Sequence, residues 1–173
     1  MIDSQQLRAA QAPIKGRYRD DPASALLTLR AVGTLGEESL TCKVETGRGL
    51  AEAGLHPAAG GDGLSLCSGD MLLEALVACA GVTLRAVATA LDIEVRGGTI
   101  RAEGDLDFRG TMAVGKEAPV GFRSVRLNFE LETDADEEQL ATLLKLTERY
   151  CVIYQSLRNP PSTSAVIVGH PPG

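Results

Sequence analysis

The chain has 173 residues, of which 44% are hydrophobic, and this length suits a single domain with a substantial core. The formal net charge of −6 and the lack of a basic cluster exclude a typical nucleic-acid-binding protein. The absence of Trp and the small number of Tyr and Phe residues also argue against stacking platforms for bases. The composition therefore predicts a globular protein whose partners are not nucleic acids.

Residues 1–22 form a polar N-terminal extension, and residues 23–173 form the predicted single domain. The extension has no apolar run and carries acidic residues early, so it does not resemble a secretory signal, and we expect a cytoplasmic protein. The four cysteines are then expected to be thiols at rest. Residues 4–11 predict one short helix that ends before Pro13, because the residue preceding a proline is disfavoured in helices.

Two candidate strands follow the extension, at residues 26–33 and 38–47, and they predict a hairpin around Gly36. In the second strand Cys42 alternates with polar residues and shares a face with Leu40. This alternation predicts that Cys42 faces the core. A buried thiol of this kind is usually inert.

Residues 68–91 predict one long helix that is apolar on nearly every side, after a Gly-rich loop at residues 54–67 without a phosphate-binding motif. Ser68 is the predicted N-cap. The helix has about the length of a bilayer span, but Glu74 and Arg85 lie well inside it, where a membrane would make them costly. We therefore expect the central helix of a globular protein with no membrane partner.

Period-two alternation of apolar and polar residues resumes at residues 100–109 and again at 124–131. These segments predict two half-buried strands in an antiparallel pair. Strands arranged around one central helix predict an α+β fold. Because one small sheet cannot cover all the apolar surface of the helix, we expect a homodimer to supply the missing cover.

A second helix is predicted near the C-terminus, opened by a capping box of Asp134 and Glu137. Its apolar side ends at Cys151, so this second thiol is also expected to face the interior. The pattern leaves open whether residues 152–157 continue this helix or begin a new one. Residues 164–168 predict a last short strand.

Cysteine chemistry is the functional class that the residues favour. The chain has two histidines, His56 and His170, and no CxxC pair, so the ligand spacing of a zinc site is absent and we expect no metal. A hydrolase using Cys79 with His56 stays open. Two inward-facing thiols, Cys79 and Cys151, allow redox chemistry, although burial raises a thiol pKa unless a cationic neighbour compensates. A plain core thiol is the alternative.

Three runs of sequence carry a family resemblance: GGDG with SGDMLLEALVACAGVTLRAVA, then DFRGT with APVGFRSVRLNFELETDA, and finally LTERYCVIYQSL. Together they resemble the OsmC/Ohr family of osmotically inducible and organic-hydroperoxide-resistance proteins, over roughly Leu26 to Val168. The resemblance implies an OsmC-like α+β fold with antiparallel sheets around a long buried helix. It also implies an intertwined homodimer with thiol peroxidase activity.

In the mechanism that this resemblance implies, Cys79 is the peroxidatic cysteine and Cys151 the resolving one. Cys79 would be oxidised by an organic hydroperoxide or hydrogen peroxide to a sulfenic acid, and Cys151 would close a disulfide. An external dithiol reductant would restore both thiols, and no metal, haem, flavin or other cofactor would take part. The alternative is a non-enzymatic OsmC-like dimer that binds an apolar ligand or senses oxidation.

The sequence departs from the family pattern at two places. Family members typically open the long helix with Pro-Glu, and this chain has Ser68-Gly69 there. Asp70 is adjacent, but its spacing from Cys79 puts it on the opposite helix face. Many members also have Pro after the second cysteine, where this chain has Val152.

The resemblance further implies an arginine that holds the reactive thiolate. Three arginines, Arg17, Arg19 and Arg30, lie in the region that could supply it, from the same chain or from a partner. We select Arg30, because it lies within a predicted strand.

Overall fold

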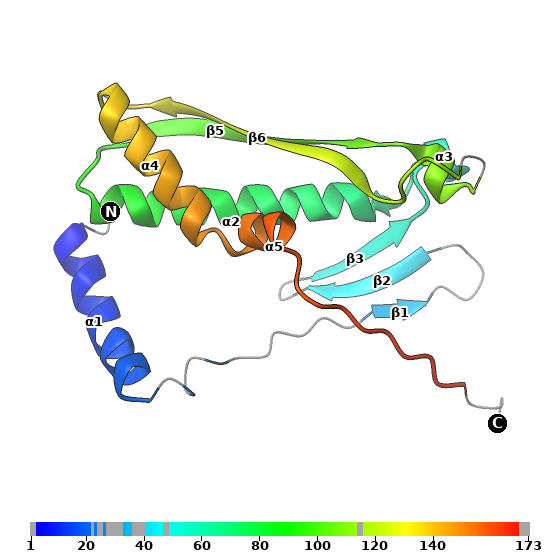
Figure 1. Ribbon diagram of the computed structural model, residues 1–173, viewed down its shortest axis with the longest axis horizontal. Helices are drawn as coiled ribbons and strands as arrows, with labels where there is room; N and C mark the ends of the chain where they lie inside the picture. The colour runs from blue at the N-terminus through cyan, green and yellow to red at the C-terminus, as the bar shows by residue number, and fades with distance from the viewer. Residues whose placement is uncertain are drawn as a thin grey trace.

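A computed structural model describes residues 3–21, 23, 26, 33–35, 41–46, 49–113 and 116–169. Its helices and strands confirm an α+β fold, with one long helix and two small sheets (Figure 1). In chain order they are α1 (Ser4–Asp20), β1 (Gly33–Leu35), β2 (Thr41–Thr46), β3 (Gly49–Gly54), η2 (Pro57–Ala59), β4 (Leu66–Cys67), α2 (Ser68–Ala90), β5 (Gly97–Leu106), α3 (Phe108–Thr111), β6 (Phe122–Glu132), α4 (Glu137–Tyr150) and α5 (Val152–Arg158).

The predicted long helix is α2, and the other elements are arranged around it (Figure 1). The β5–β6 hairpin runs along α2, α4 crosses it, and α5 lies near its middle. By length and apolar composition α2 could also cross a bilayer, a test that the core helices of globular proteins pass as well. The prediction that Ser68 is the N-cap of this helix was wrong. Because β4 runs directly into the helix, Cys67 takes the cap position and makes no side-chain cap hydrogen bond.

The antiparallel pair predicted after the long helix is β5 and β6, with Ile100 opposite Phe129. The alternation of half-buried and exposed residues along both strands is as predicted. Gly81 lets β5 approach α2, because a Cβ there would lie 3.1 Å from Ile100 Cδ1. The first strand was predicted to reach residue 109, but it ends at Leu106. Asp107 accepts a hydrogen bond from the Arg109 N–H and starts α3 instead.

The predicted N-terminal hairpin is present in part, since β1 pairs antiparallel with β2 and Leu35 lies opposite Cys42. Residues 27–32, Gly36 and the side chain of Cys42 lie outside the described residues, so the burial of Cys42 stays a prediction. The sequence did not predict β3, which pairs with β2. Part of the loop predicted at residues 54–67 forms regular elements, the short helix η2 and the strand β4, which pairs parallel with β3.

Helix α1 continues through Pro13, so the predicted end before this residue was wrong. The helix begins with a capping box of Asp3 and Gln6, whose side chains bond to each other's backbone N–H groups. A proline inside a helix removes one N–H donor but leaves the turns on either side free to form. On α1, Arg8 forms an ion pair with Asp92, which lies just after the end of α2.

The capping box of α4 lies two residues later than predicted, at Asp136 and Gln139 rather than at Asp134 and Glu137. The physical reason is a tertiary contact. The carboxylate of Asp134 accepts two hydrogen bonds from the Arg96 guanidinium, at 2.7 and 2.9 Å. This leaves Asp136 to cap the helix.

The last predicted strand, at residues 164–168, does not form. Residues 160–169 have no regular secondary structure. Ile167 is 97% exposed, and its neighbours Val166 and Val168 are also exposed. A strand requires a hydrogen-bonded partner, and none of the strands in the described part of the chain pairs with this segment.

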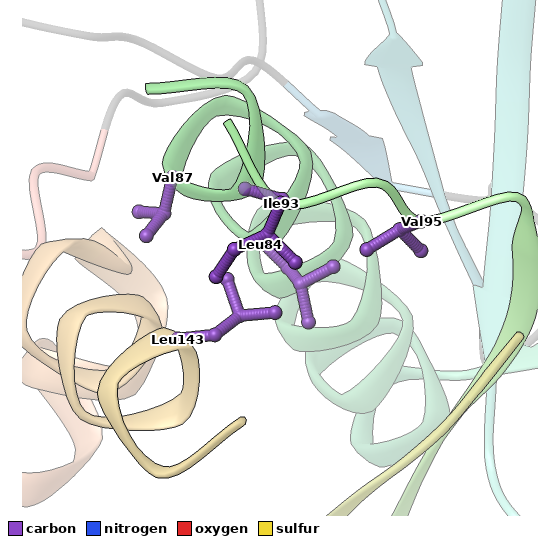
Figure 2. Packing of buried hydrophobic residues seen from close by; sticks show 6 residues of the cluster. Leu84, Val87, Ile93, Val95 and Leu143 are labelled. Atoms are coloured by element: carbon purple, nitrogen blue, oxygen red, sulfur yellow. The ribbon is translucent and has the colours of Figure 1, made fainter. Parts of the chain in front are cut away.

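Two buried clusters hold the helices together. The first joins the C-terminal half of α2 to α4 through Leu84 and Leu143, and Figure 2 shows these side chains pointing toward each other. The second lies nearer the N-terminal end of α2 and contains Leu76, Ala80 and Cys151. Leu143 is 1% exposed, whereas Leu144 is 45% exposed, so only part of the predicted apolar face of α4 is buried.

Candidate active site

The structure brings the two predicted site cysteines together. Cys79 lies in the middle of α2, half-buried, and packs against the second core cluster, of which Cys151 is a member with 0% exposure. Both are free thiols, and Cys151 is among the groups that lower the pKa of Cys79. The two cysteines that the family resemblance implied as a pair therefore pack in one cluster of a single chain.

Cys151 occupies the junction between α4 and α5. Its N–H still bonds to the Thr147 carbonyl at 2.9 Å, which completes the last turn of α4. Its backbone is then extended, with φ −73 and ψ 110, so a new helix starts at Val152. The first N–H groups of a helix have no partner within that helix. At this junction the N–H groups of Val152 and Ile153 lower the pKa of Cys79.

These contacts favour the thiolate form of Cys79. Burial opposes ionisation and raises the pKa of Cys79, but four hydrogen bonds outweigh it. They come from the N–H of Ile153, the thiol of Cys151, the N–H of Val152 and the hydroxyl of Thr83. The net result is a pKa for Cys79 below its usual value. Cys79 thus has the character of a nucleophile, and no cation of the described residues is among the main causes of its lowered pKa.

Cys151 has the opposite character. Burial raises its pKa, and the negative charge that develops on Cys79 raises it further, although the N–H of Tyr154 acts in the other direction. Because the shifts have opposite signs, the pair loses its first proton from Cys79, and Cys151 keeps its own.

An apolar cavity of about 340 Å³ adjoins the cysteine cluster. Leu76, Val125, Leu127 and Tyr154 line the cavity and also pack in the cluster. Phe122 and Leu157 extend the apolar wall, and Arg123, Ser124 and Arg158 supply its polar part. The Tyr154 hydroxyl is held by Glu148 at 3.0 Å. Neither thiol lines the cavity itself, but it can receive a small, largely apolar molecule beside the cluster that contains them.

The arginine of the predicted site is not placed. Arg30 lies outside the described residues, so its role stays a prediction. Arg17 and Arg19 lie on α1. Among the described residues, no arginine is one of the main causes of the lowered pKa of Cys79. The N–H groups at the start of α5 are among those causes.

The start of α2 lines a second cavity, of about 370 Å³, that is distinct from the cysteine cluster. Gly69 and Asp70 line it, so Asp70 lies away from Cys79, as the helix spacing predicted. His56 also lines this cavity, with its ring stacked on Phe108 at 4.9 Å. A hydrolytic pair of Cys79 and His56 is therefore not formed. No set of three potential metal ligands gathers among the described residues.

Sequence reasoning missed two sources of hydrogen bonds to Cys79. Thr83 follows Cys79 by one helical turn, and this spacing was visible in the sequence. The N–H groups of Val152 and Ile153 were not visible as donors. They become available only because the chain leaves one helix and enters another at Cys151.

Comparisons with known proteins agree with this fold. A sequence profile of the OsmC-like protein family matches residues 60–165. Among solved structures, an OsmC-like protein from Mycoplasma pneumoniae has a TM-score of 0.65 at 16% identity, covering 78% of this chain and 89% of that one. An organic hydroperoxide resistance protein from Elizabethkingia anophelis, bound to thiocyanate, has a TM-score of 0.62 at 17% identity, covering 78% and 91%.

A third similar structure is the organic hydroperoxide resistance protein OhrB of Bacillus subtilis, with a TM-score of 0.52 at 20% identity, covering 78% of this chain and 93% of that one. No curated protein matches the sequence significantly. The profile match spans more than half of the chain and includes both cysteines. The chain belongs to the OsmC-like protein family.

Proposed function

We propose that this protein is a thiol peroxidase that reduces organic hydroperoxides or hydrogen peroxide with Cys79 and Cys151. One observation carries the proposal: Cys79 of α2 packs in one cluster with Cys151 of the α4–α5 junction, and the pKa values of the two thiols are shifted in opposite directions. A nucleophile and a resolving thiol need this division of roles. The names of the similar structures from Elizabethkingia anophelis and Bacillus subtilis support the same class of substrate.

In the proposed cycle the Cys79 thiolate attacks one oxygen of the hydroperoxide and breaks the O–O bond. The other oxygen leaves with a proton as an alcohol or as water, and Cys79 becomes a sulfenic acid. The Cys151 thiolate then attacks the Cys79 sulfur, which expels water and forms a disulfide. An external dithiol reduces this disulfide by exchange, and a reducing cytoplasmic location would supply such a reductant.

The surroundings of the cysteines support an organic hydroperoxide as substrate. The cavity beside them is mainly apolar, with Leu76, Val125 and Leu127 in its wall. An alkyl chain placed there would remove apolar surface from water. We propose that Arg30, from the same chain or its partner, assists the reaction. The rate of the first oxidation step in Arg30→Gln tests this assignment, and Arg17→Gln is the control.

We also propose that the working form is a homodimer. The chain exposes 13240 Å², against about 8000 Å² for a compact monomer of its mass. One stripe of α2 is uncovered, with Val82 74% exposed and Leu72 also exposed. A second copy would cover this apolar stripe. Light scattering should give twice the monomer mass, and Val82→Glu should reduce it to the monomer mass.

A hydroperoxide titration tests the peroxidase proposal. One equivalent of cumene hydroperoxide should consume two thiols, and peptide mapping should find a Cys79–Cys151 disulfide that a dithiol reverses. The control is Cys79→Ser. If this variant and the wild type consume peroxide equally slowly, the peroxidase proposal fails.

The apolar cavity also supports a second candidate function, a non-enzymatic protein that binds an apolar ligand or senses oxidation. The same titration separates the two. A sensor would be oxidised slowly and once, with no turnover when a dithiol is supplied.

A further inference from the structure

Two threonines accompany the cysteine pair, each one helical turn from a cysteine on its own helix. Thr83 follows Cys79 on α2, and Thr147 precedes Cys151 on α4. The Thr83 hydroxyl is among the groups that lower the pKa of Cys79. The Thr147 side chain is 1% exposed, and its Oγ1 is buried with no hydrogen-bond partner. The two sites have the same spacing in sequence, but only the Thr83 hydroxyl acts on its cysteine.

The unpartnered hydroxyl of Thr147 needs an explanation. Burying a hydroxyl without a hydrogen bond is unfavourable, and Val has nearly the same shape without that cost. A threonine inside a helix usually satisfies its hydroxyl with the carbonyl four residues earlier. Thr89 does this in α2, where its Oγ1 donates to the Arg85 carbonyl at 2.8 Å. Thr147 makes no such bond, which indicates that its partner is present in another state of the protein.

The state that creates a partner is the ionised form of Cys151. The N–H of Cys151 bonds to the Thr147 carbonyl, so the two side chains lie on the same face, one turn apart. While Cys79 is a thiolate, Cys151 keeps its proton, because burial and the charge on Cys79 raise its pKa. Once Cys79 is oxidised, Cys151 must lose this proton to act as a nucleophile, and its sulfur then accepts hydrogen bonds.

We propose that the Thr147 hydroxyl donates a hydrogen bond to the Cys151 thiolate during the resolving step, in which this sulfur attacks the sulfenic acid of Cys79 and expels water. The inference rests on the proposed peroxidase function and extends it. Thr83 serves the attacking thiolate of the first step, and Thr147 serves that of the second.

The rest of the environment of Cys151 leaves this role to Thr147. The side chains from β5 and β6 in the cluster are apolar: Ala102, Val125, Leu127 and Phe129. The N–H groups of Tyr154 and Ile153 donate from the α5 side. The titratable groups nearby are Cys79 on α2 and the Tyr154 hydroxyl, which already donates to Glu148. From the α4 side, Thr147 is the buried side-chain donor one turn away.

Single-turnover oxidation with cumene hydroperoxide tests the proposal in the full-length protein. Thr147→Val should slow disulfide formation about tenfold, because a hydrogen bond to a charged group is lost. Sulfenic acid trapped by dimedone should accumulate, and the rate of the first oxidation should not change. Thr147→Ser should restore resolution. The control is Thr142→Val, an exposed threonine on the same helix.

The pH profile separates this role from a structural one. In Thr147→Val the resolving rate should rise with pH at higher pH than in the wild type, while the unfolding midpoint stays the same or increases. An unchanged resolving rate and pH profile would overturn the proposal. So would an equal slowing of both steps.

A second measurement does not depend on peroxide. In a Cys79→Ser background, the ultraviolet thiolate absorbance of Cys151 is obtained by subtracting that of the Cys79→Ser, Cys151→Ser variant. Adding Thr147→Val should raise the pKa of Cys151, and no change would overturn the inference whatever the activity. If this shift is observed but the wild type does not consume hydroperoxide, the peroxidase proposal fails. The inference that the Thr147 hydroxyl donates to the Cys151 thiolate then still holds.

Discussion

Cys67, at the N-cap of α2, and Cys79, in the middle of this helix, have contrasting environments. Cys67 stands at the start of α2, a position usually associated with reactive cysteines. It lines a cavity with His56 and Asp70 and has no cysteine beside it among the residues of that cavity. Cys79 lies in mid-helix, where the backbone N–H groups of α2 are already bonded, and yet two other N–H groups lower its pKa.

The difference shows that thiol activation here depends on a second helix. The donors to Cys79 come from the first residues of α5, which follow Cys151 in the chain. The same junction therefore supplies both the groups that stabilise the nucleophile and the thiol that resolves it. Four predictions test this contrast between the two sites, beginning with the largest expected effect.

Removing each thiol separately should give opposite results. Cys79→Ser should abolish hydroperoxide consumption to the level of the buffer, because the nucleophile is lost. Cys67→Ser should retain the wild-type rate, since Cys67 has no role in the proposed cycle. A coupled assay with a dithiol reductant measures both. Loss of activity in Cys67→Ser alone would reverse the assignment of the two sites.

Removing the resolving thiol should stop the cycle after its first step. Cys151→Ser should still react with one equivalent of hydroperoxide, but a sulfenic acid should remain on Cys79 in place of the disulfide. Mass spectrometry after dimedone trapping would detect the adduct on Cys79. Formation of a disulfide between Cys79 and Cys67 in this variant would contradict the separation of the two sites.

The contact between α4 and α2 should stabilise the fold and hold Cys151 in place. Leu143→Ala removes a side chain that is 1% exposed, so the free energy of unfolding should fall by about 2–5 kcal/mol. Leu144→Ala, one residue later and half-exposed, should cost less than about 1 kcal/mol. Urea denaturation compares the pair. Equal losses would mean that α4 is not docked through Leu143.

The N–H of Val152 can be removed with little change of backbone. Val152 is the first residue of α5, where proline is tolerated, and Cys151 before it is already extended. Val152→Pro should raise the pKa of Cys79 toward its usual value and slow the first step about threefold to tenfold at neutral pH. Val152→Ala keeps the N–H and is the control.

The sign of the pH effect follows from the reactive form. The thiolate reacts, so the rate of the first step rises as the pH increases through the pKa of Cys79. Because this pKa is lowered in the wild type, the rate persists to lower pH than for an ordinary thiol. In Val152→Pro the rise should move to higher pH. An unchanged profile would show that the Val152 N–H does not support the thiolate.

Local sequence pattern predicted the features that depend on periodicity. The apolar content of residues 68–91 predicted α2, and the alternation at residues 100–109 and 124–131 predicted the β5–β6 pair. The same periodicity placed Cys79 and Cys151 on apolar faces. These features were predictable because each depends on side chains a few residues apart.

The predictions that were wrong concern features that depend on contacts between distant residues. Asp134 appeared to be a helix cap, but Arg96 binds its carboxylate, so Asp136 caps α4. Residues 164–168 have the composition of a strand but no strand pairs with them in the described part of the chain. Neither outcome can be inferred from neighbours in sequence.

By itself the sequence determined the central helix, the two long strands and the presence of two inward-facing cysteines, because hydrophobic periodicity is a local property. Only the tertiary structure decided that the chain begins a new helix after Cys151, and that its first N–H groups meet Cys79. It also decided that Thr147 is buried without a partner. A thiol pKa depends on donors and burial from every element nearby, and those elements are brought together only by folding.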